Sequence, residues 1–344
     1  MKLQMQMSNI VEENNMIYFW DRMNQTFCSM NSKTKKIDIL LKAKGIPESF
    51  HALNVFNIFG KIFFTSQFST EIIILNRESL EYEFIDFDKK RDYSQYSSVT
   101  YNEDIMFFPY ELDNMLIIFQ PKKKTYEEVE IDLPKLVLGK HQSNTVLFED
   151  NVYIGVYGTN LIVKINLANL SVDVITLPDD IEISCLEIQN NGIVVTNLVK
   201  NEVLFLGDKS QKRVSLEPSE YEGRNFSRIL TYNDRTILLP SKTDSIYVIN
   251  EEQILKRIVF DNYKEYCLHG SLMWFASIHD DSLFCWPWGY RKLVIIDLKT
   301  YELSQIDTEV SSLQAMKLLC QNDFFAESEE VNLNTLIEYL KDVN

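Results

Sequence analysis

The stretch Lys292-Leu-Val-Ile-Ile-Asp-Leu-Lys-Thr-Tyr-Glu-Leu-Ser-Gln-Ile-Asp307 contains the unit from which this chain is built. The apolar run Leu293 to Ile296 is rich in β-branched residues and is followed by a polar turn over Asp297 to Tyr301. A second run then alternates apolar with polar residues, with Leu303 and Ile306 on the apolar side. Two short runs of this kind, separated by a turn, are typical of paired antiparallel strands. The stretch therefore predicts a β-hairpin.

Similar hairpins recur along the whole chain at a nearly constant spacing. They are anchored at Phe27, Ile72, Leu116, Leu161, Val203, Ile246 and Leu293. The steps between successive anchors are 45, 44, 45, 42, 43 and 47 residues. In each unit, an apolar run, a turn on Asn, Asp or Gly, and an aromatic or β-branched run precede the hairpin. A period of this length with only strand signals predicts an all-β fold, a seven-bladed β-propeller of four-stranded antiparallel blades.

The C-terminal end departs from the repeat. Residues 1–330 are assigned to the propeller, as seven repeats of about 45 residues plus an extra strand pair within Leu313 to Phe325. Leu333, Leu336, Ile337 and Leu340 then follow at helical spacing. Residues 331–344 are therefore predicted to form an amphipathic helix packed on the propeller. Two alternatives remain for the extra strands: they complete the ring against the first unit, or they form an incomplete eighth blade.

Bulk composition excludes several classes of function. The formal net charge is -16, with 50 acidic and 34 basic residues, which argues against a nucleic-acid binder and against docking on an anionic membrane. No apolar run has the length of a membrane span or a signal sequence. The five cysteines are scattered without a C-x-x-C pair, and no nucleotide-binding or common hydrolase motif occurs. We expect a cytoplasmic protein.

Two phrases carry a resemblance to known repeats. Ser245-Ile-Tyr-Val-Ile-Asn250 and Lys292-Leu-Val-Ile-Ile-Asp-Leu-Lys-Thr300 resemble the outer-strand phrase of YVTN-type and quinoprotein-like β-propellers. The Gly-His pairs of WD repeats and the double glycines of kelch repeats are absent from the sequence, and a Trp-Asp pair occurs once, at Trp20-Asp21, rather than in every repeat. The resemblance implies the fold and transfers no catalytic residue.

Three of the four histidines precede predicted innermost strands. His51 lies 11 residues before Ile62 of the predicted second strand, and His141 lies 11 residues before Val152. His269 lies 14 residues before the corresponding Leu283, which we attribute to a longer turn between the first and second strands. The units concerned are the second, fourth and seventh, which are spread almost evenly around a seven-fold ring. In propellers, the loop that enters the innermost strand shares one face with the loop between the second and third strands. That face surrounds the mouth of the central channel, where ligands bind.

Two interpretations of the histidines stay open. Three imidazoles at the channel mouth suit a divalent metal, Mn or Mg, or an anionic ligand. Virginiamycin-type and oligogalacturonate lyases are similar in placing histidine ligands there. That resemblance implies a metal-dependent lyase or isomerase, with Glu182 or Tyr290 transferring the proton. In the other interpretation, these are polar residues of exposed loops beside a wet channel.

Aromatic and basic residues gather at the same predicted face. The segment Trp286-Pro-Trp-Gly-Tyr-Arg291, placed between the second and third strands of the last unit, is the most distinctive. The candidate ligand-binding residues are Arg22, Gln95, Tyr110, Tyr157, Arg224, Trp286, Trp288, Tyr290 and Arg291. Aromatics with guanidinium groups are the composition of a recognition surface. The leading hypothesis is a binding or scaffolding propeller that holds a small polar ligand, a peptide or a partner protein at this face; the metal-dependent lyase is the alternative.

Overall fold

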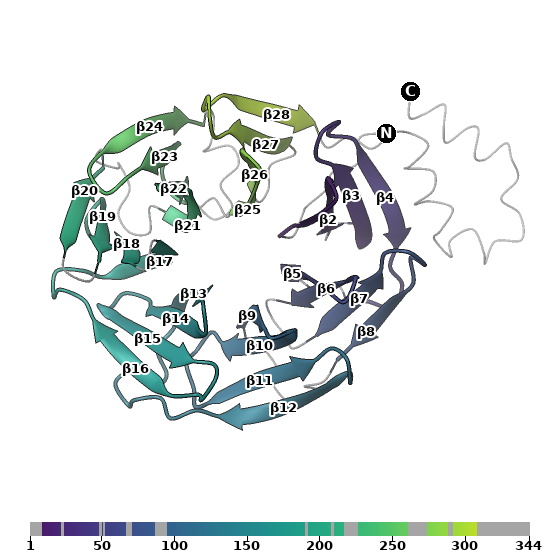
Figure 1. Ribbon diagram of the computed structural model, residues 1–344, viewed down its shortest axis with the longest axis horizontal. Coiled ribbons are helices and arrows are strands. Elements are labelled where there is room, and N and C mark those ends of the chain that lie inside the picture. The colour runs from purple at the N-terminus through teal and green to yellow at the C-terminus, as the bar shows by residue number, and fades with distance from the viewer. Residues whose placement is uncertain are drawn as a thin grey trace, which may run out of the picture.

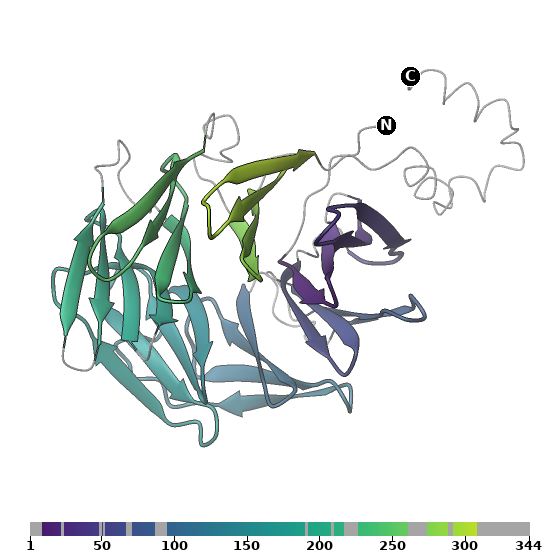
Figure 2. The ribbon, with the colours of Figure 1, turned by 45° about the horizontal axis from the view of Figure 1, so that its top comes forward.

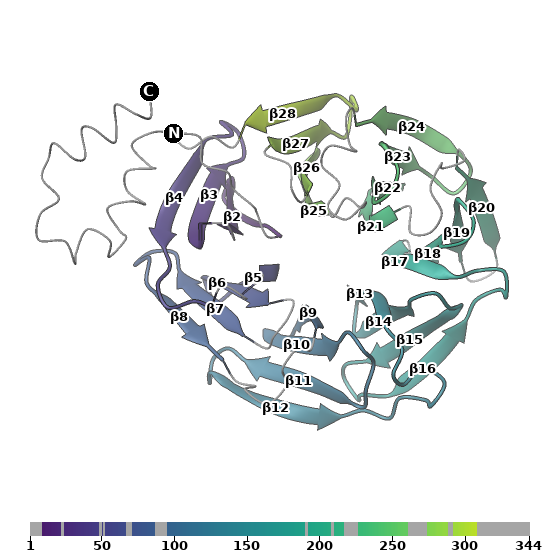
Figure 3. The same ribbon diagram turned by 180° about the vertical axis from the view of Figure 1, so that it is seen from behind.

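The computed structural model describes residues 9–307 except 22–23, 48–49, 51, 67–70, 87–94, 190–191, 208–209, 217–225, 261–273 and 288–291. In that part, 28 strands form seven four-stranded sheets arranged as a ring (Figures 1 and 3). Within each sheet the strands are antiparallel and follow one another in chain order. The predicted seven-bladed β-propeller is confirmed.

The seven sheets are numbered here as blades 1 to 7 along the chain. Blade 1 contains β1 (Val11–Glu13), β2 (Met16–Asp21), β3 (Thr26–Asn31) and β4 (Ile37–Lys42). Blade 2 contains β5 (Ala52–Ile58), β6 (Lys61–Ser66), β7 (Ile72–Asn76) and β8 (Tyr82–Ile85). Blade 3 contains β9 (Tyr96–Tyr101), β10 (Asp104–Pro109), β11 (Met115–Gln120) and β12 (Thr125–Glu130). Blade 4 contains β13 (Gln142–Phe148), β14 (Asn151–Val156), β15 (Leu161–Asn166) and β16 (Val172–Thr176).

Blade 5 contains β17 (Ile183–Gln189), β18 (Gly192–Asn197), β19 (Glu202–Leu206) and β20 (Gln211–Ser215). Blade 6 contains β21 (Phe226–Tyr232), β22 (Arg235–Pro240), β23 (Ser245–Ile249) and β24 (Ile254–Val259). Blade 7 contains β25 (Trp274–His279), β26 (Ser282–Pro287), β27 (Lys292–Asp297) and β28 (Leu303–Asp307). The first strand of each blade lies nearest the ring axis and the fourth forms the outer edge (Figure 1).

The inner strands of a blade are joined by tight turns of two residues. Asn102 and Glu103, between β9 and β10, have φ angles of 50° and 70°. Asn14 and Asn15, between β1 and β2, have φ angles of 52° and 63°. Positive φ at both positions is the mark of a type I′ turn, whose twist matches that of the flanking strands. Asparagine tolerates this conformation, which explains why it recurs between the inner strands.

The outer hairpins share a second kind of turn, in which a side-chain oxygen accepts hydrogen bonds from backbone N–H groups of the turn. In the hairpin of blade 7, Asp297 Oδ1 accepts the backbone N–H groups of Lys299 and Thr300, both at 2.8 Å. Asn31, Asn76 and Asn166 do the same at the ends of β3, β7 and β15. The repeated phrase therefore ends in Asn or Asp because the turn needs this acceptor.

The blades pack face to face through apolar clusters. Between blades 1 and 2, Trp20 contacts Phe27 edge-on, with ring centroids 5.0 Å apart, and Phe50 and Phe64 fill the same cluster. The middle strands are covered on both faces, and all five residues of β23 are buried. This double coverage explains why the middle strands are nearly continuous apolar runs.

Blades 1 and 7 close the ring by side-chain packing. Each is formed by one continuous segment, and in the described residues no strand from one end of the chain joins the sheet at the other end. Phe284 and Trp286 of β26 pack in one apolar cluster with Phe19 of β2. The Lys35 ammonium lies 4.4 Å from the centroid of the Phe284 ring, over its face. Figure 2 shows the two blades side by side at this seam.

Two predictions fall on residues that are not described. These are the extra strand pair after residue 307 and the C-terminal helix over 331–344. The described part of the chain contains strands and no helix, and hence no helix that could cross a membrane.

Candidate functional site: the rim of blades 3 to 5

In three successive blades, the same backbone hydrogen bond joins the residue just after the second strand to the residue just before the innermost strand. The bonds run from Tyr110 N to Gln95 O (2.6 Å), from Tyr157 N to His141 O (2.9 Å) and from Leu198 N to Glu182 O (2.7 Å). Each bond extends the ladder of the two inner strands by one step into the loops. Gln95, His141 and Glu182 are therefore equivalent positions on one face of the propeller.

Backbone bonds also connect neighbouring blades along this face. Gln142 N donates to Tyr110 O at 2.9 Å, which ties blade 4 to blade 3. Ile183 N donates to Thr159 O at 2.7 Å, and Gly158 N donates to Ile183 O at 3.0 Å, which tie blade 5 to blade 4. The loops of blades 3 to 5 therefore form one hydrogen-bonded belt rather than independent flexible tips.

Tyr110 and His141 stack on each other within this belt. Their ring centroids are 5.1 Å apart and the rings are inclined by 33°. Glu111 forms an isolated antiparallel bridge with His141, which fixes the backbone beneath the stacked rings. The His141 side chain is exposed, and Tyr110 is partly buried. This pair presents an imidazole supported on an aromatic face.

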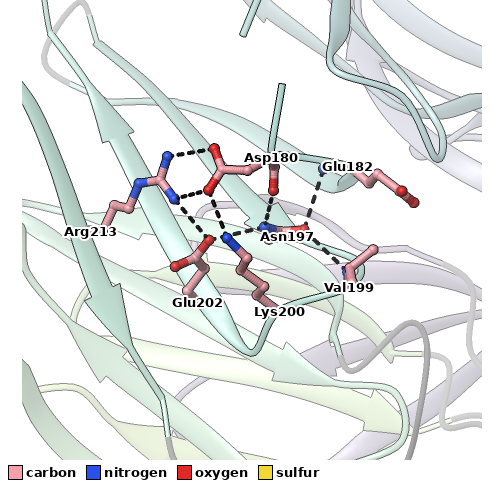
Figure 4. Close-up of polar contacts among 7 residues, drawn as sticks. All are labelled: Asp180, Glu182, Asn197, Val199, Lys200, Glu202 and Arg213. Atoms are coloured by element: carbon pink, nitrogen blue, oxygen red, sulfur yellow. Dashed lines mark hydrogen bonds and ion pairs between the residues drawn. The ribbon is translucent and has the colours of Figure 1, made fainter. Parts of the chain in front are cut away.

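Asn197, at the end of β18, organises the neighbouring part of the rim (Figure 4). Its side chain is 5% exposed, and its Oδ1 accepts the backbone N–H groups of Glu182 (3.3 Å) and Val199 (3.1 Å). Its Nδ2 donates to the Asp180 carbonyl oxygen (3.1 Å) and to Glu202 Oε1 (3.0 Å). One buried amide thus makes four hydrogen bonds and joins the loop entering β17 to the turn after β18.

An ion-pair cluster surrounds this amide. The Arg213 guanidinium binds both carboxylate oxygens of Asp180, at 2.5 and 2.8 Å, and Lys200 Nζ lies 2.7 Å from the same group. These hydrogen bonds, with Arg213 first, hold the pKa of Asp180 well below its usual range. In Figure 4 the Glu182 carboxylate points away from this cluster. The exposed Glu182 side chain is therefore available for contacts on the rim.

Two large apolar side chains are exposed at the same end of the blades. Val199 is 68% exposed at the tip of the turn that Asn197 fixes, and Leu136, in the loop between β12 and β13, is 50% exposed. We define the rim site as Tyr110, Leu136, His141, Tyr157, Glu182 and Val199. It combines apolar, aromatic and ionisable groups on a backbone that internal hydrogen bonds hold in place.

The rim site contains four of the residues that the sequence indicated, namely Tyr110, His141, Tyr157 and Glu182, with Gln95 beside them. Of the remaining candidates, Trp286 is described. The others lie outside the described residues: Arg22, His51, Arg224, His269, Trp288, Tyr290 and Arg291. Their roles stay predictions.

The assignment of Trp286 to a loop was wrong. Trp286 lies in strand β26, where it pairs with Phe275, and it is 2% exposed in the apolar cluster between blades 7 and 1. The strand continues to Pro287, just as β10 ends at Pro109 and β22 at Pro240. Proline ends these second strands because it cannot donate the next ladder hydrogen bond.

The explanation offered for the spacing of His269 was also wrong. The turn between β25 and β26 contains only Asp280 and Asp281, like the two-residue turns of other blades. The extra residues therefore precede the strand. His141 comes directly before β13, whereas β25 begins at Trp274, five residues after His269. His269 itself lies outside the described residues.

The metal hypothesis has no further support in the described part of the chain. No group of three or more His, Cys, Asp or Glu side chains there is arranged to hold a metal ion. His51 and His269 lie outside that part. A histidine-held Mn or Mg ion stays a prediction, which elemental analysis of the purified protein and of His51→Ala would test.

Sequence reasoning missed Asn197, Asp180, Arg213 and Val199. The fixed turn at Val199 depends on a buried amide, and an asparagine in a loop-rich sequence looks the same whether it is buried or exposed. The Asp180–Arg213 pair joins the loop entering a blade to its outermost strand, a separation of 33 residues. No local pattern carries that signal.

Comparisons with known proteins give a fold and no family. No family model matches the chain, and no curated protein matches it. It is similar to a streptogramin B lyase (TM-score 0.63, 13% identity, covering 83% of this chain and 92% of that one). It is also similar to a catalytically inactive virginiamycin B lyase from Staphylococcus aureus with quinupristin (0.62, 12%, 83% and 95%). A third is YCF48 bound to D1 peptide (0.56, 8%, 76% and 82%). At these identities the similarity shows the β-propeller fold alone.

Proposed function

We propose that this chain is a binding propeller that holds a partner protein or peptide on the rim site. The observation that carries the proposal is Val199, an apolar side chain 68% exposed on a turn fixed by the buried Asn197 amide. An apolar group displayed on a rigid loop costs little conformational entropy to bury in a complex. Leu136 and the Tyr110–His141 pair extend the same surface.

The charge of the site indicates the chemistry of the partner. Glu111 and Glu182 are exposed on this face, and the whole chain carries a formal charge of -16. Complementary charge speeds association and selects among partners. The partner would therefore present an apolar or aromatic side chain flanked by lysine or arginine. A small polar ligand is a weaker candidate, because it would leave Val199 and Leu136 in water.

A structural neighbour supports this use of the fold. YCF48, which resembles this chain at a TM-score of 0.56, is bound to a peptide in its structure. That observation concerns YCF48, and it supports the present proposal by showing that a propeller of similar shape takes a peptide.

The test compares two exposed valines. Val199→Asp places a charge in the rim site, whereas Val259→Asp does so on the outer strand β24, where Val259 is 49% exposed. We expect proteins that co-purify with the parent chain to be retained by Val259→Asp and lost from Val199→Asp, with His141→Ala weakening their binding. Equal retention by the two valine variants would contradict the proposal.

A further inference from the structure

The innermost strands of four blades share an irregularity near their first residues. The register with the second strand shifts between Ala52 and Asn54, between Gln142 and Thr145, between Ile183 and Cys185, and between Phe226 and Arg228. A β-bulge turns the side chains beside it away from the regular alternation of the sheet. The side chain of the third residue of each of these strands therefore departs from the regular alternation between the two faces of the sheet.

In two blades, this third residue is an asparagine that binds the next blade. Asn54 Nδ2 donates to the Ser98 carbonyl oxygen of blade 3 at 3.0 Å. Asn144 Nδ2 donates to Leu186 O of blade 5 at 2.7 Å, and its Oδ1 accepts Leu186 N at 2.8 Å. These amides join neighbouring innermost strands.

Blade 6 has an arginine at the same position, and it binds differently. Arg228 Nη1 donates to Asn9 Oδ1 at 3.0 Å, and Asn9 Nδ2 donates to Asn54 Oδ1 at 3.0 Å. The chain of hydrogen bonds thus runs from blade 6 through the segment before blade 1 to blade 2. Blades 6 and 2 are not neighbours in the ring, so these bonds connect them across its centre. The Arg228 guanidinium therefore lies near the ring axis.

Most of the hydrogen-bonding capacity of Arg228 is not used by the described part of the protein. A guanidinium has five N–H groups, and the bond to Asn9 uses one of them. Arg228 is partly exposed, and none of its nitrogens is fully buried without a partner. The site therefore offers a planar set of donors beside two amides, those of Asn9 and Asn54.

The positive charge of Arg228 is also only partly balanced. No carboxylate of the described residues forms an ion pair with it, and the acidic side chain that acts on it electrostatically is Glu187 of β17. Burial raises the pKa of Glu187 to about 7, so about half of it is neutral at neutral pH. The nearby Cys285 thiol is neutral as well, because burial raises its pKa. A poorly compensated charge favours an anionic partner.

We propose that Arg228 anchors an oxyanion site at the ring axis, which takes the carboxylate or phosphate group of a small ligand. The guanidinium fork matches both groups, because two parallel N–H donors meet two oxygens. Asn9 lies beside the guanidinium through the bond from Arg228 Nη1, and Asn54 follows through the bond from Asn9 Nδ2. The site is separate from the rim site and does not depend on the function proposed for it.

Glu187 makes the site sensitive to pH. The ionised Glu187 carboxylate and the anionic ligand are both attracted to Arg228, so they compete for it. In the described part of the chain, Arg228 is the one charged group of another strand that acts on Glu187. Protonation of Glu187 removes this competition, so the ligand binds more tightly at pH 6 than at pH 8. Acetate stays ionised over this range and isolates the effect.

The test follows thermal unfolding with acetate and, separately, inorganic phosphate, each at ionic strength matched with chloride. We expect a saturable rise in Tm of roughly 2–4 °C in the parent chain. For acetate, the midpoint concentration should increase about threefold to tenfold from pH 6 to pH 8. Arg228→Gln should lose the response to both ions. The ratio of the acetate and phosphate midpoints in the parent chain identifies the ligand class.

Two further variants keep the test decisive. Glu187→Gln should bind acetate equally at both pH values, because it has no proton to exchange. Arg228→Lys keeps the positive charge and should still respond to phosphate, with a weaker response to acetate. This variant replaces Arg228→Gln in the test if Arg228→Gln does not fold. An undiminished response in Arg228→Gln, or an unchanged pH dependence in Glu187→Gln, would overturn the proposal.

Discussion

Arg228 Nη1 lies 3.0 Å from Asn9 Oδ1, a contact that joins blade 6 to the segment before blade 1. Blade 7 lies between them in the ring, so the contact bypasses the seam where the side chains of blades 1 and 7 pack together (Figure 1). Asn9 continues the connection to Asn54 of blade 2. Ring closure is therefore reinforced at the axis by polar side chains, in addition to the apolar seam.

Asn9→Ala should destabilise the protein. The substitution removes the acceptor for Arg228 and the donor for Asn54, and we expect a loss of about 1–2 kcal/mol in the free energy of unfolding. Asn57→Ala is the matched control, because Asn57 also connects two blades, through Glu13, but is exposed. Denaturant unfolding of both variants measures the difference. Equal stabilities would show that the axial contact contributes nothing to closure.

Asn197→Ala should loosen the rim and lower stability. It leaves the N–H groups of Val199 and Glu182 without their acceptor, at a cost of roughly 1–3 kcal/mol. Lys200→Ala removes only one arm of an exposed ion pair in the same cluster and should cost less than about 1 kcal/mol. Thermal unfolding gives the ranking. A larger loss for Lys200→Ala than for Asn197→Ala would show that the ion pairs, not the amide, hold the turn.

The stability of the protein should respond to pH through Glu187. The pKa of this group is raised from 4.5 to about 7 by burial, so the folded state binds the proton more tightly than the unfolded state. Its contribution therefore favours folding below pH 4.5, declines between pH 4.5 and 7, and stays at its low level above pH 7. Glu187→Gln removes this decline, with a difference of about 3 kcal/mol between the ends of the window. Glu128→Gln, at an exposed position of β12, serves as control.

The check on this assignment is the unfolding free energy of both variants at pH 5 and pH 8. The parent chain should lose stability relative to Glu187→Gln over this interval, whereas Glu128→Gln should follow the parent. If Glu187→Gln and the parent chain change in parallel, Glu187 does not titrate as described.

Gly155→Ala should be strongly destabilising although the position is in a strand. A Cβ atom there would overlap the Ser143 hydroxyl and lie 3.0 Å from Ile183 Cγ2 of blade 5. We expect a loss of roughly 2 kcal/mol from this overpacking. Gly207→Ala, whose Cβ would lie nearest to the Ser210 hydroxyl, at 3.1 Å, should cost much less. Adding Ser143→Ala should restore part of the loss, and an equal cost at both glycines would contradict the packing argument.

The fold was predictable because its signals are local. The phrase ending in Asp297 contains its own turn acceptor, and Asn14 and Asn102 mark tight turns directly in the sequence. A period of about 45 residues then determines the number of blades. Closure was not predictable in the same way, since the contact between Arg228 and Asn9 spans 219 residues.

The candidate site was predictable only in part. Tyr110, His141, Tyr157 and Glu182 were indicated because loop positions are equivalent in every repeat. Trp286 was misplaced because an aromatic residue beside proline reads as a loop, while the seam between two blades needs a large apolar side chain. Val199 was missed because exposure depends on the buried Asn197 beneath its turn.

Hydrogen exchange, measured with and without a co-purified partner, tests the binding role of the rim site most directly. We expect slower exchange on binding in residues 110–112, 136–142, 157–160 and 197–202, the loops of blades 3 to 5. We expect no change in the outer strands β8, β16 and β24. Protection confined to those outer strands, with the four loops unchanged, would contradict a binding role of the rim site.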